Sequence, residues 1–190
     1  MTVLYFALQA LFWAPFLIRG QLDRASGSHR DGATAHADPR ATMLVWAHVG
    51  AFACLYGGAG WAVWRGGEAV LPLSVQLLAV PVMLASTWSM IRVLVVFRSW
   101  RLRAVLTEAH ELCTEGPFSV VRHPIYTGLV LVGVATLLVT PNVATVAGFV
   151  LNLIVGDLRA RAEERLLLAA FGERYAAYMA RTKRFLPGVY

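Results

Sequence analysis

Apolar runs long enough to cross a lipid bilayer are the feature that most limits how this chain can fold. Three of them occupy Thr2 to Ile18, Ala41 to Trp64 and Leu71 to Phe97, and a helix of about 20 apolar residues spans the hydrocarbon core of a membrane. A soluble domain of 190 residues would not bury the 58% apolar content of this sequence. The chain is therefore expected to be an integral membrane protein.

A fourth apolar block, from Pro124 to Val155, is too long for a single crossing. The run Thr140-Pro141-Asn142 near its middle supplies a break, with the proline placed to start a new helix. The block therefore predicts a helical hairpin over residues 124–156. With the three earlier spans it predicts an all-α polytopic membrane protein of about five transmembrane helices, followed by a cytoplasmic or interfacial C-terminal helical segment.

The distribution of positive charge predicts the orientation of the chain in the membrane. Lys and Arg gather in three polar segments, which are residues 19–40, 98–123 and 157–190. The opposite segment, residues 65–70, carries Arg65 alone. Because basic segments stay on the cytoplasmic side, the N-terminus is expected outside and the C-terminus in the cytoplasm. Residues 1–97 then form three transmembrane helices joined in part by a cytoplasmic linker at 19–40.

Composition also excludes several classes of partner. The net charge of +6 does not indicate nucleic acid, because the arginines lie between apolar runs and form no stripe among exposed aromatic residues. Cys54 and Cys113 lack the spacing of metal ligands. His29 and His36 lie in a Gly-, Ser- and Asp-rich stretch that is typical of a flexible linker. We expect no metal site and no nucleic acid, with the lipid bilayer as the main partner.

The geometry of the predicted hairpin brings two polar clusters to the same depth. Helices that leave a turn at Thr140-Pro141 rise equally per residue, so residues 122–126 come level with residues 156–159. Arg159 and Glu163 share a face of the second helix by their i, i+4 spacing. Taken singly, that pair would be read as a surface ion pair, and His123 as an interfacial residue that caps a helix. Their convergence favours a site.

Small residues in the same two helices predict that their backbones approach closely. Helices pack in lipid through such residues, which here are Gly128, Gly133, Gly148 and Gly156. The hairpin is therefore expected to be tight.

Two stretches of the C-terminal half resemble one family of membrane enzymes. They are HELCTEGPFSVVRHPIYTG, from His110 to Gly128, and RAEERLLLAAFGERYAAYMARTKRFLP, from Arg161 to Pro187. Together they resemble the isoprenylcysteine carboxyl methyltransferase and phospholipid methyltransferase superfamily. The resemblance covers residues 98–187, so it implies that residues 98–190 form the cofactor-binding catalytic region.

The resemblance implies a cofactor, S-adenosylmethionine, and the residues that hold it. The implied cofactor-binding residues are His110, Glu111, Leu112, Cys113, Phe118, His123, Pro124, Ile125, Tyr126 and Glu163. Arg159 matches the arginine that the family uses near the substrate, and Arg159, Tyr126 and His123 are the catalytic candidates. Cys113 stands where valine is usual and Phe118 where tyrosine is common, so the ring is kept and its hydroxyl is lost. A hydrogen bond to the cofactor is therefore not expected at Phe118.

The implied reaction is methyl transfer to a lipophilic small-molecule or lipidated acceptor, with carboxyl O-methylation of an isoprenylcysteine-like substrate favoured. A carboxylate or thiolate acceptor needs no base, whereas an alcohol or ammonium needs one, for which His123 or Tyr126 is the local candidate. Phospholipid amine or thiol methylation, an NADPH-dependent membrane reductase and a non-enzymatic membrane scaffold are the alternatives. The C-terminal segment Arg165 to Arg184 suits an interfacial helix over the site, or a plain membrane anchor.

Overall fold

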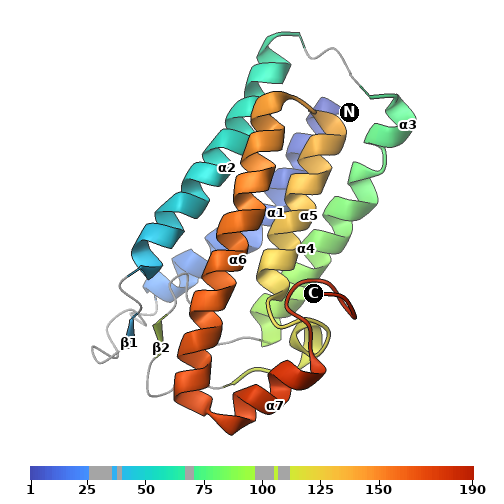
Figure 1. Ribbon diagram of the computed structural model, residues 1–190. Helices are drawn as coiled ribbons and strands as arrows, with labels where there is room; N and C mark the ends of the chain where they lie inside the picture. Colours follow the sequence, from blue (N-terminus) through green and yellow to red (C-terminus); the bar gives the residue numbers. More distant parts are fainter. Residues whose placement is uncertain (26–35, 38–39, 67–70, 97–104, 107–111) are drawn as a thin grey trace.

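Long apolar helices dominate the fold, as the sequence predicts. A computed structural model describes residues 1–25, 36–37, 40–66, 71–96, 105–106 and 112–190. Four stretches within it are helical and apolar enough to cross a membrane, and the helix Pro124–Val139 is a shorter apolar one. The helices are α1 (Thr2–Ala25), α2 (Ala41–Trp64), α3 (Leu73–Gln76), α4 (Ala79–Val96), α5 (Pro124–Val139), α6 (Val143–Phe171) and α7 (Glu173–Arg181) (Figure 1).

Two boundaries differ from the prediction in the N-terminal half. α1 continues to Ala25, so the expected linker at 19–40 begins later than its polar composition indicates. Residues 26–35 and 38–39 of that linker lie outside the described residues. His36–Ala37 (β1) pairs antiparallel with Val105–Leu106 (β2). The third span is divided into α3 and α4, although Leu73–Val96 still counts as one membrane-length stretch.

The predicted hairpin is present, with its break at residues 140–142. α5 ends at Val139, and Asn142 caps α6 by accepting a hydrogen bond from the Thr145 backbone N–H at 3.1 Å. The Thr145 hydroxyl in turn accepts from the Asn142 backbone N–H at 2.8 Å. This reciprocal capping box satisfies two free backbone donors, so the new helix begins after Asn142 rather than at Pro141.

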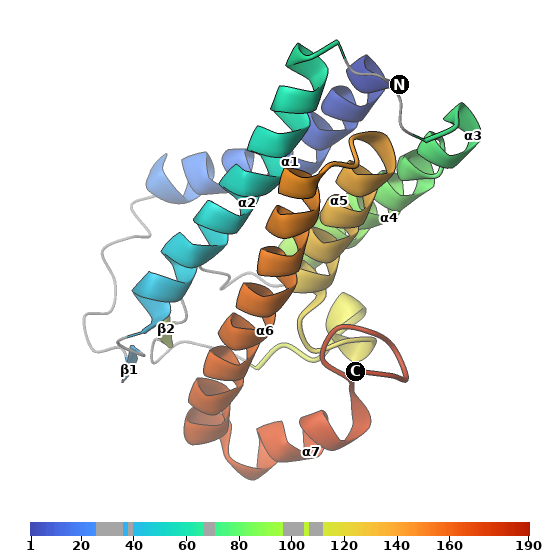
Figure 2. The same ribbon diagram turned by 45° about the horizontal axis from the view of Figure 1, so that its top comes forward.

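The expectation of a tight hairpin is wrong at Gly148 and Gly156. A Cβ built on Gly148 would lie 2.4 Å from the backbone nitrogen of Leu55, so this glycine permits contact between α6 and α2. A Cβ on Gly128 would face Met90 of α4, and one on Gly156 would meet nothing within 4 Å in the part of the chain that the structure describes. Within the hairpin, Gly133 receives the ring of Phe149. The first half of α6 therefore packs closely on α2, and both ribbon views show these two helices side by side (Figures 1 and 2).

Buried side-chain hydrogen bonds join α1 to the other helices of the bundle. The Tyr5 hydroxyl lies 2.7 Å from the Thr136 hydroxyl of α5. The Trp13 indole donates to the Tyr56 hydroxyl at 2.8 Å, and this hydroxyl donates to Gln9 at 2.9 Å. Polar groups in an apolar interior require such partners, so these bonds fix α1 against α2 and α5.

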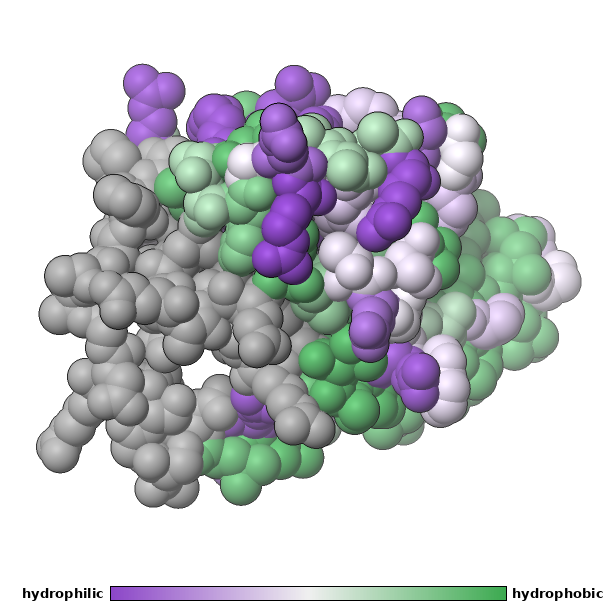
Figure 3. Space-filling model, turned by 90° about the horizontal axis from the view of Figure 1, so that it is seen from below, coloured by the Kyte–Doolittle hydropathy of each residue, from purple (hydrophilic) through white to green (hydrophobic). Residues whose placement is uncertain are grey.

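The end of the bundle opposite the hairpin turn is polar. α6 extends past its apolar half and stops at Gly172, whose φ of +51° favours glycine and lets α7 turn back beneath the bundle. Strongly hydrophilic side chains are spread over this end (Figure 3). The segment after α7 returns to the start of α5, where the backbone N–H groups of Arg122 and His123 donate to the carbonyls of Lys183 and Arg184.

Candidate functional site

The start of α5 presents three of the predicted residues at the polar end of the bundle. Pro124 is the first residue of the helix, where its missing N–H costs no helical hydrogen bond. His123, just before it, and Tyr126, one turn into the helix, are both buried. The proline therefore fixes where the helix begins and sets His123 and Tyr126 side by side, with ring centroids 5.7 Å apart.

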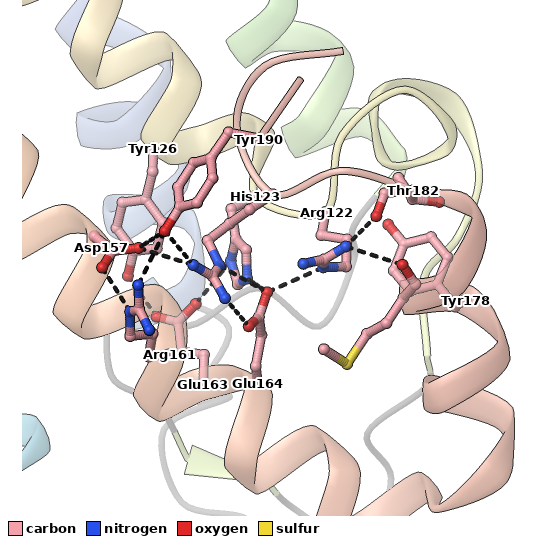
Figure 4. A network of polar contacts seen from close by, with 12 residues as sticks. Arg122, His123, Tyr126, Asp157, Arg161, Glu163, Glu164, Tyr178, Thr182 and Tyr190 are labelled. Carbon is pink, nitrogen blue, oxygen red and sulfur yellow. Dashed lines mark hydrogen bonds and ion pairs between the residues drawn. The ribbon is translucent and has the colours of Figure 1, made fainter. Parts of the chain in front are cut away.

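One face of α6 meets these two rings. The Tyr126 hydroxyl donates to Glu163 Oε1 at 2.5 Å, and His123 Nδ1 lies 3.4 Å from Glu163 Oε2. The Arg159 guanidinium lies over the Tyr126 ring, 5.3 Å from its centroid. The two clusters that the helix register predicts to converge are thus in direct contact (Figure 4).

The neighbouring carboxylate, Glu164, forms a second cluster that the sequence did not single out. Its Oε1 accepts from Arg122 Nε at 3.0 Å, and its Oε2 accepts from Arg184 Nη2 at 2.7 Å. His123 Nε2 lies 3.4 Å from Oε1 of the same group. His123 therefore stands between two carboxylates, and Glu164 joins α6 to the start of α5 and to the returning C-terminal segment.

Further contacts hold the C-terminal segment over the site. Arg122 Nη1 donates to the carbonyls of Met179 and Thr182, and the Thr127 hydroxyl donates to the carbonyl of Phe185 at 2.9 Å. The Phe185 ring lies across Tyr126 at 6.2 Å between centroids. The segment after α7 thus covers the site with an aromatic side chain.

An outer layer of charge joins α6 to the same segment. Asp157 accepts from Arg184 at 2.9 Å, from Arg161 at 2.6 Å and from the Tyr190 hydroxyl at 2.8 Å. The Asp157 and Arg161 side chains are 25% and 52% exposed, so their pairing with each other contributes little stability.

His48 of α2 is a second residue that sequence reasoning missed. It is buried, its Nδ1 lies 3.1 Å from Arg159 Nη1, and its ring stacks on Tyr126 with centroids 5.9 Å apart. A histidine within an apolar span was the available signal, since polar groups there face the protein interior. Periodicity alone does not show that α2 neighbours α6.

The structure describes only some of the remaining predicted cofactor residues. Ile125 packs against the apolar core. Phe118 is buried in a short 3₁₀ turn, Gly116–Ser119, and its carbonyl accepts from the Tyr178 hydroxyl of α7 at 2.5 Å. Leu112 and Cys113 are half-buried, and burial raises the pKa of the Cys113 thiol. His110 and Glu111 lie outside the described residues.

Electrostatics favour the protonated form of His123 in this arrangement. Burial alone lowers the pKa of His123, but its contacts with Glu163 and Glu164 outweigh burial and raise the pKa above its ordinary value. Among the described residues of the two clusters and their outer layer, four arginines, Arg122, Arg159, Arg161 and Arg184, face three carboxylates, Asp157, Glu163 and Glu164. A protonated His123 adds to the positive charge of these described residues.

Comparison with known proteins identifies one family. The model of the isoprenylcysteine carboxyl methyltransferase (ICMT) family matches residues 68–169, more than half of the chain. A search of curated proteins found no match. The matched region runs from the third span through the hairpin and includes His123, Tyr126, Arg159 and Glu163.

Proposed function

Because the chain belongs to the isoprenylcysteine carboxyl methyltransferase family, we propose that it transfers the methyl group of S-adenosylmethionine to a carboxylate of a lipophilic, isoprenylcysteine-like acceptor. Family membership and the apolar helices together make it a membrane methyltransferase. The cofactor, the acceptor and the roles of individual residues are proposed here.

The described side chains fit the proposed cofactor. S-adenosylmethionine supplies, when bound, a methyl group on a positively charged sulfur. The Glu163 side chain is 27% exposed, and Tyr126 and His123 hold its carboxylate in place for a positive part of the cofactor. The helix start at Pro124 places partial positive charge where a carboxylate would bind. Residues 110–113, Phe118 and Ile125 complete the proposed cofactor site.

The observation that carries the choice of acceptor is the engagement of both candidate bases. His123 lies between two carboxylates that favour its protonated form, and the Tyr126 hydroxyl already donates to Glu163. Neither group is arranged to remove a proton from an alcohol or an ammonium. An acceptor that is ionised without help satisfies this arrangement, and a carboxylate is such a group.

Arg159 is the residue that we propose binds this carboxylate. Its planar guanidinium offers donors in a fork that matches two carboxylate oxygens. The Tyr126 ring and His48 hold it from two directions, which limits the side-chain entropy lost on binding. Methyl transfer requires alignment of the acceptor oxygen with the sulfur–carbon bond, and positioning of this kind supplies roughly 7–11 kcal/mol in favourable cases. The Phe185 ring would help to exclude water.

We further propose that the site faces the cytoplasm. The N-terminus and the polar end with α7 lie at opposite ends of the bundle (Figure 1). The positive-inside rule assigns the basic segments 19–40, 98–123 and 157–190 to the cytoplasm, and the last of these contains α7. Labelling of single introduced cysteines at Lys183 and Arg65 in intact cells tests this, because only position 65 should react with an impermeant reagent.

The decisive assay incubates the purified protein with methyl-labelled S-adenosylmethionine and N-acetyl-S-farnesylcysteine. We expect label in the acceptor that mild base releases as methanol, which identifies a methyl ester. The methyl ester of the same acceptor, with its carboxylate blocked, should take up no label. Base-stable label in phosphatidylethanolamine would instead identify an amine methyltransferase, and no transfer to any lipid fraction would refute the proposed activity.

Two substitutions separate binding of the cofactor from binding of the acceptor. Glu163→Gln should weaken cofactor affinity measured by calorimetry, whereas Arg159→Ala should lower turnover and raise the acceptor KM with less effect on cofactor affinity. Arg174→Ala, at an exposed position of α7, is the matched arginine control. Unchanged cofactor affinity in Glu163→Gln would contradict the assignment of that carboxylate.

A further inference from the structure

Polar side chains of α6 and α2 form a patch beside Arg159. Only Arg159 has a role in the proposed methyl transfer. Asn152, Gly156 and Arg159 follow each other on one face of α6 by their i, i+4, i+7 spacing. His48 faces them from α2, with Nε2 at 3.4 Å from Asn152 Oδ1 and Nδ1 at 3.1 Å from Arg159 Nη1. One imidazole ring therefore bridges Asn152 and Arg159.

The hydrogen-bond directions in this patch follow from Arg159. A guanidinium is always a donor, so His48 Nδ1 must accept and the ring must be neutral with its proton on Nε2. That proton is donated to Asn152, which must present its oxygen. The Asn152 Nδ2 group is then left as a donor, and it has no hydrogen-bond partner among the described residues although Asn152 is 1% exposed. An unpaired buried donor costs about 1–3 kcal/mol.

Open space adjoins this donor. Gly156 is buried, yet a Cβ built on it would meet no described residue within 4 Å, in contrast to Gly148 two turns earlier, where Leu55 is in contact. The close seam between α2 and α6 thus widens at Gly156, between the unpaired amide of Asn152 and the guanidinium of Arg159. A buried donor beside unfilled space indicates a place for a ligand group.

We propose that this widening is a subsite for a neutral carbonyl group of the acceptor, such as an amide or ester oxygen, which accepts a hydrogen bond from Asn152 Nδ2. The subsite rests on the proposed function, because Arg159 holds the reacting carboxylate beside it. A neutral acceptor suits Asn152 better than an anion, since the amide lies in the apolar half of α6 and burying an unpaired charge there is costly. His48 is a positioning residue that orients both neighbours.

The test compares two acceptors that differ in one group. N-acetyl-S-farnesylcysteine carries an amide beside its carboxylate, and S-farnesyl-3-mercaptopropionate has the same chain and carboxylate without the amide. The wild type should favour the first by about five- to tenfold in kcat/KM, the effect of one hydrogen bond. Asn152→Leu should bring this ratio close to one, while the control Leu153→Ala, at an exposed position of α6, should keep the wild-type ratio.

Binding without turnover separates this proposal from the proposed function. Each acceptor is titrated against the protein in detergent, without cofactor, and the shift of the unfolding midpoint is measured. If neither acceptor is methylated but the wild type still binds the amide compound more tightly than Asn152→Leu does, the proposed activity fails and the subsite stands. An equal preference in both proteins, or no binding of either compound, overturns the subsite. Should Asn152→Leu not fold, Gly156→Leu, which fills the space, must abolish the preference while Gly156→Ala retains part of it.

Discussion

Replacing Glu164 with glutamine should destabilise the protein far more than replacing its neighbour Glu163. The Glu164 side chain is 6% exposed, and its carboxylate faces Arg122, Arg184 and His123. Glutamine keeps the shape but removes the charge and points an N–H₂ group at groups that are themselves donors. Removing one partner of a buried ion pair costs about 3–5 kcal/mol, because the remaining charges lose their compensation.

The loss of stability in Glu164→Gln should be largest where the C-terminal segment meets the start of α5. Glu164 binds the side chains of Arg122 and Arg184. Next to these contacts, the backbone N–H groups of Arg122 and His123 donate to the carbonyls of Lys183 and Arg184. The free energy of unfolding is measured by titration of detergent-solubilised protein with SDS, and hydrogen exchange reports on the amides of Arg122 and His123. We expect faster exchange at these two amides in Glu164→Gln.

Glu163→Gln is the matched comparison, since it makes the same chemical change one residue away. Glu163 is 27% exposed and its two contacts go to Tyr126 and His123, so it should lose cofactor affinity with a smaller loss of stability. A cost below about 1 kcal/mol for Glu164→Gln, as for a surface pair, would refute the reasoning. Equal destabilisation by both substitutions would refute the division of roles between the two carboxylates.

Two other predictions concern packing and pH. Gly148→Ala should cost about 1–3 kcal/mol in the same SDS titration, because its Cβ would meet the Leu55 backbone at 2.4 Å. Gly57→Ala is the control, since a Cβ at Gly57 meets no described residue within 4 Å and should not destabilise the protein. An equal effect of both substitutions would contradict the packing of α6 on α2. His123 has a folded pKa above its unfolded value of about 6.5, so the folded state binds its proton more tightly. The stabilisation by His123 should be complete below about pH 6.5 and should fall as the pH rises through the folded pKa; an identical pH dependence in His123→Gln would contradict this.

The hairpin and the convergence of residues 122–126 with Arg159 and Glu163 were predictable because both depend on local quantities. The position of the break at residues 140–142 and the constant rise of a helix fix which residues of α5 and α6 share a depth. The capping residue was less predictable, since Pro141 and Asn142 are both suitable near a helix start. The tight approach of α5 and α6 through Gly148 was wrong, because small residues show that a close contact exists but not with which helix.

His48 and Arg184 were missed for a related reason. The apolar spans are hydrophobic around their whole circumference, so their pattern does not show which face of α2 meets which helix. The chain length between Glu164 and Arg184 permits many paths, and the return of the segment after α7 depends on contacts formed only in the folded state. Glu164 was visible as part of the acidic pair, but adjacent residues on a helix point about 100° apart, so nothing local indicated that His123 would reach both.

The position of His123 between Glu163 and Glu164 explains why an adjacent acidic pair serves this site. If Glu164 were apolar, Arg122 and Arg184 would lack a buried counterion and the C-terminal segment would lose its charged contact with α6. If Glu163 were apolar, Tyr126 would lose its acceptor and the proposed cofactor site its negative charge. A protonated His123 in contact with both carboxylates reduces their mutual repulsion. It therefore allows Glu163, in the proposed cofactor site, and Glu164, which anchors the C-terminal segment, to occupy successive positions of α6.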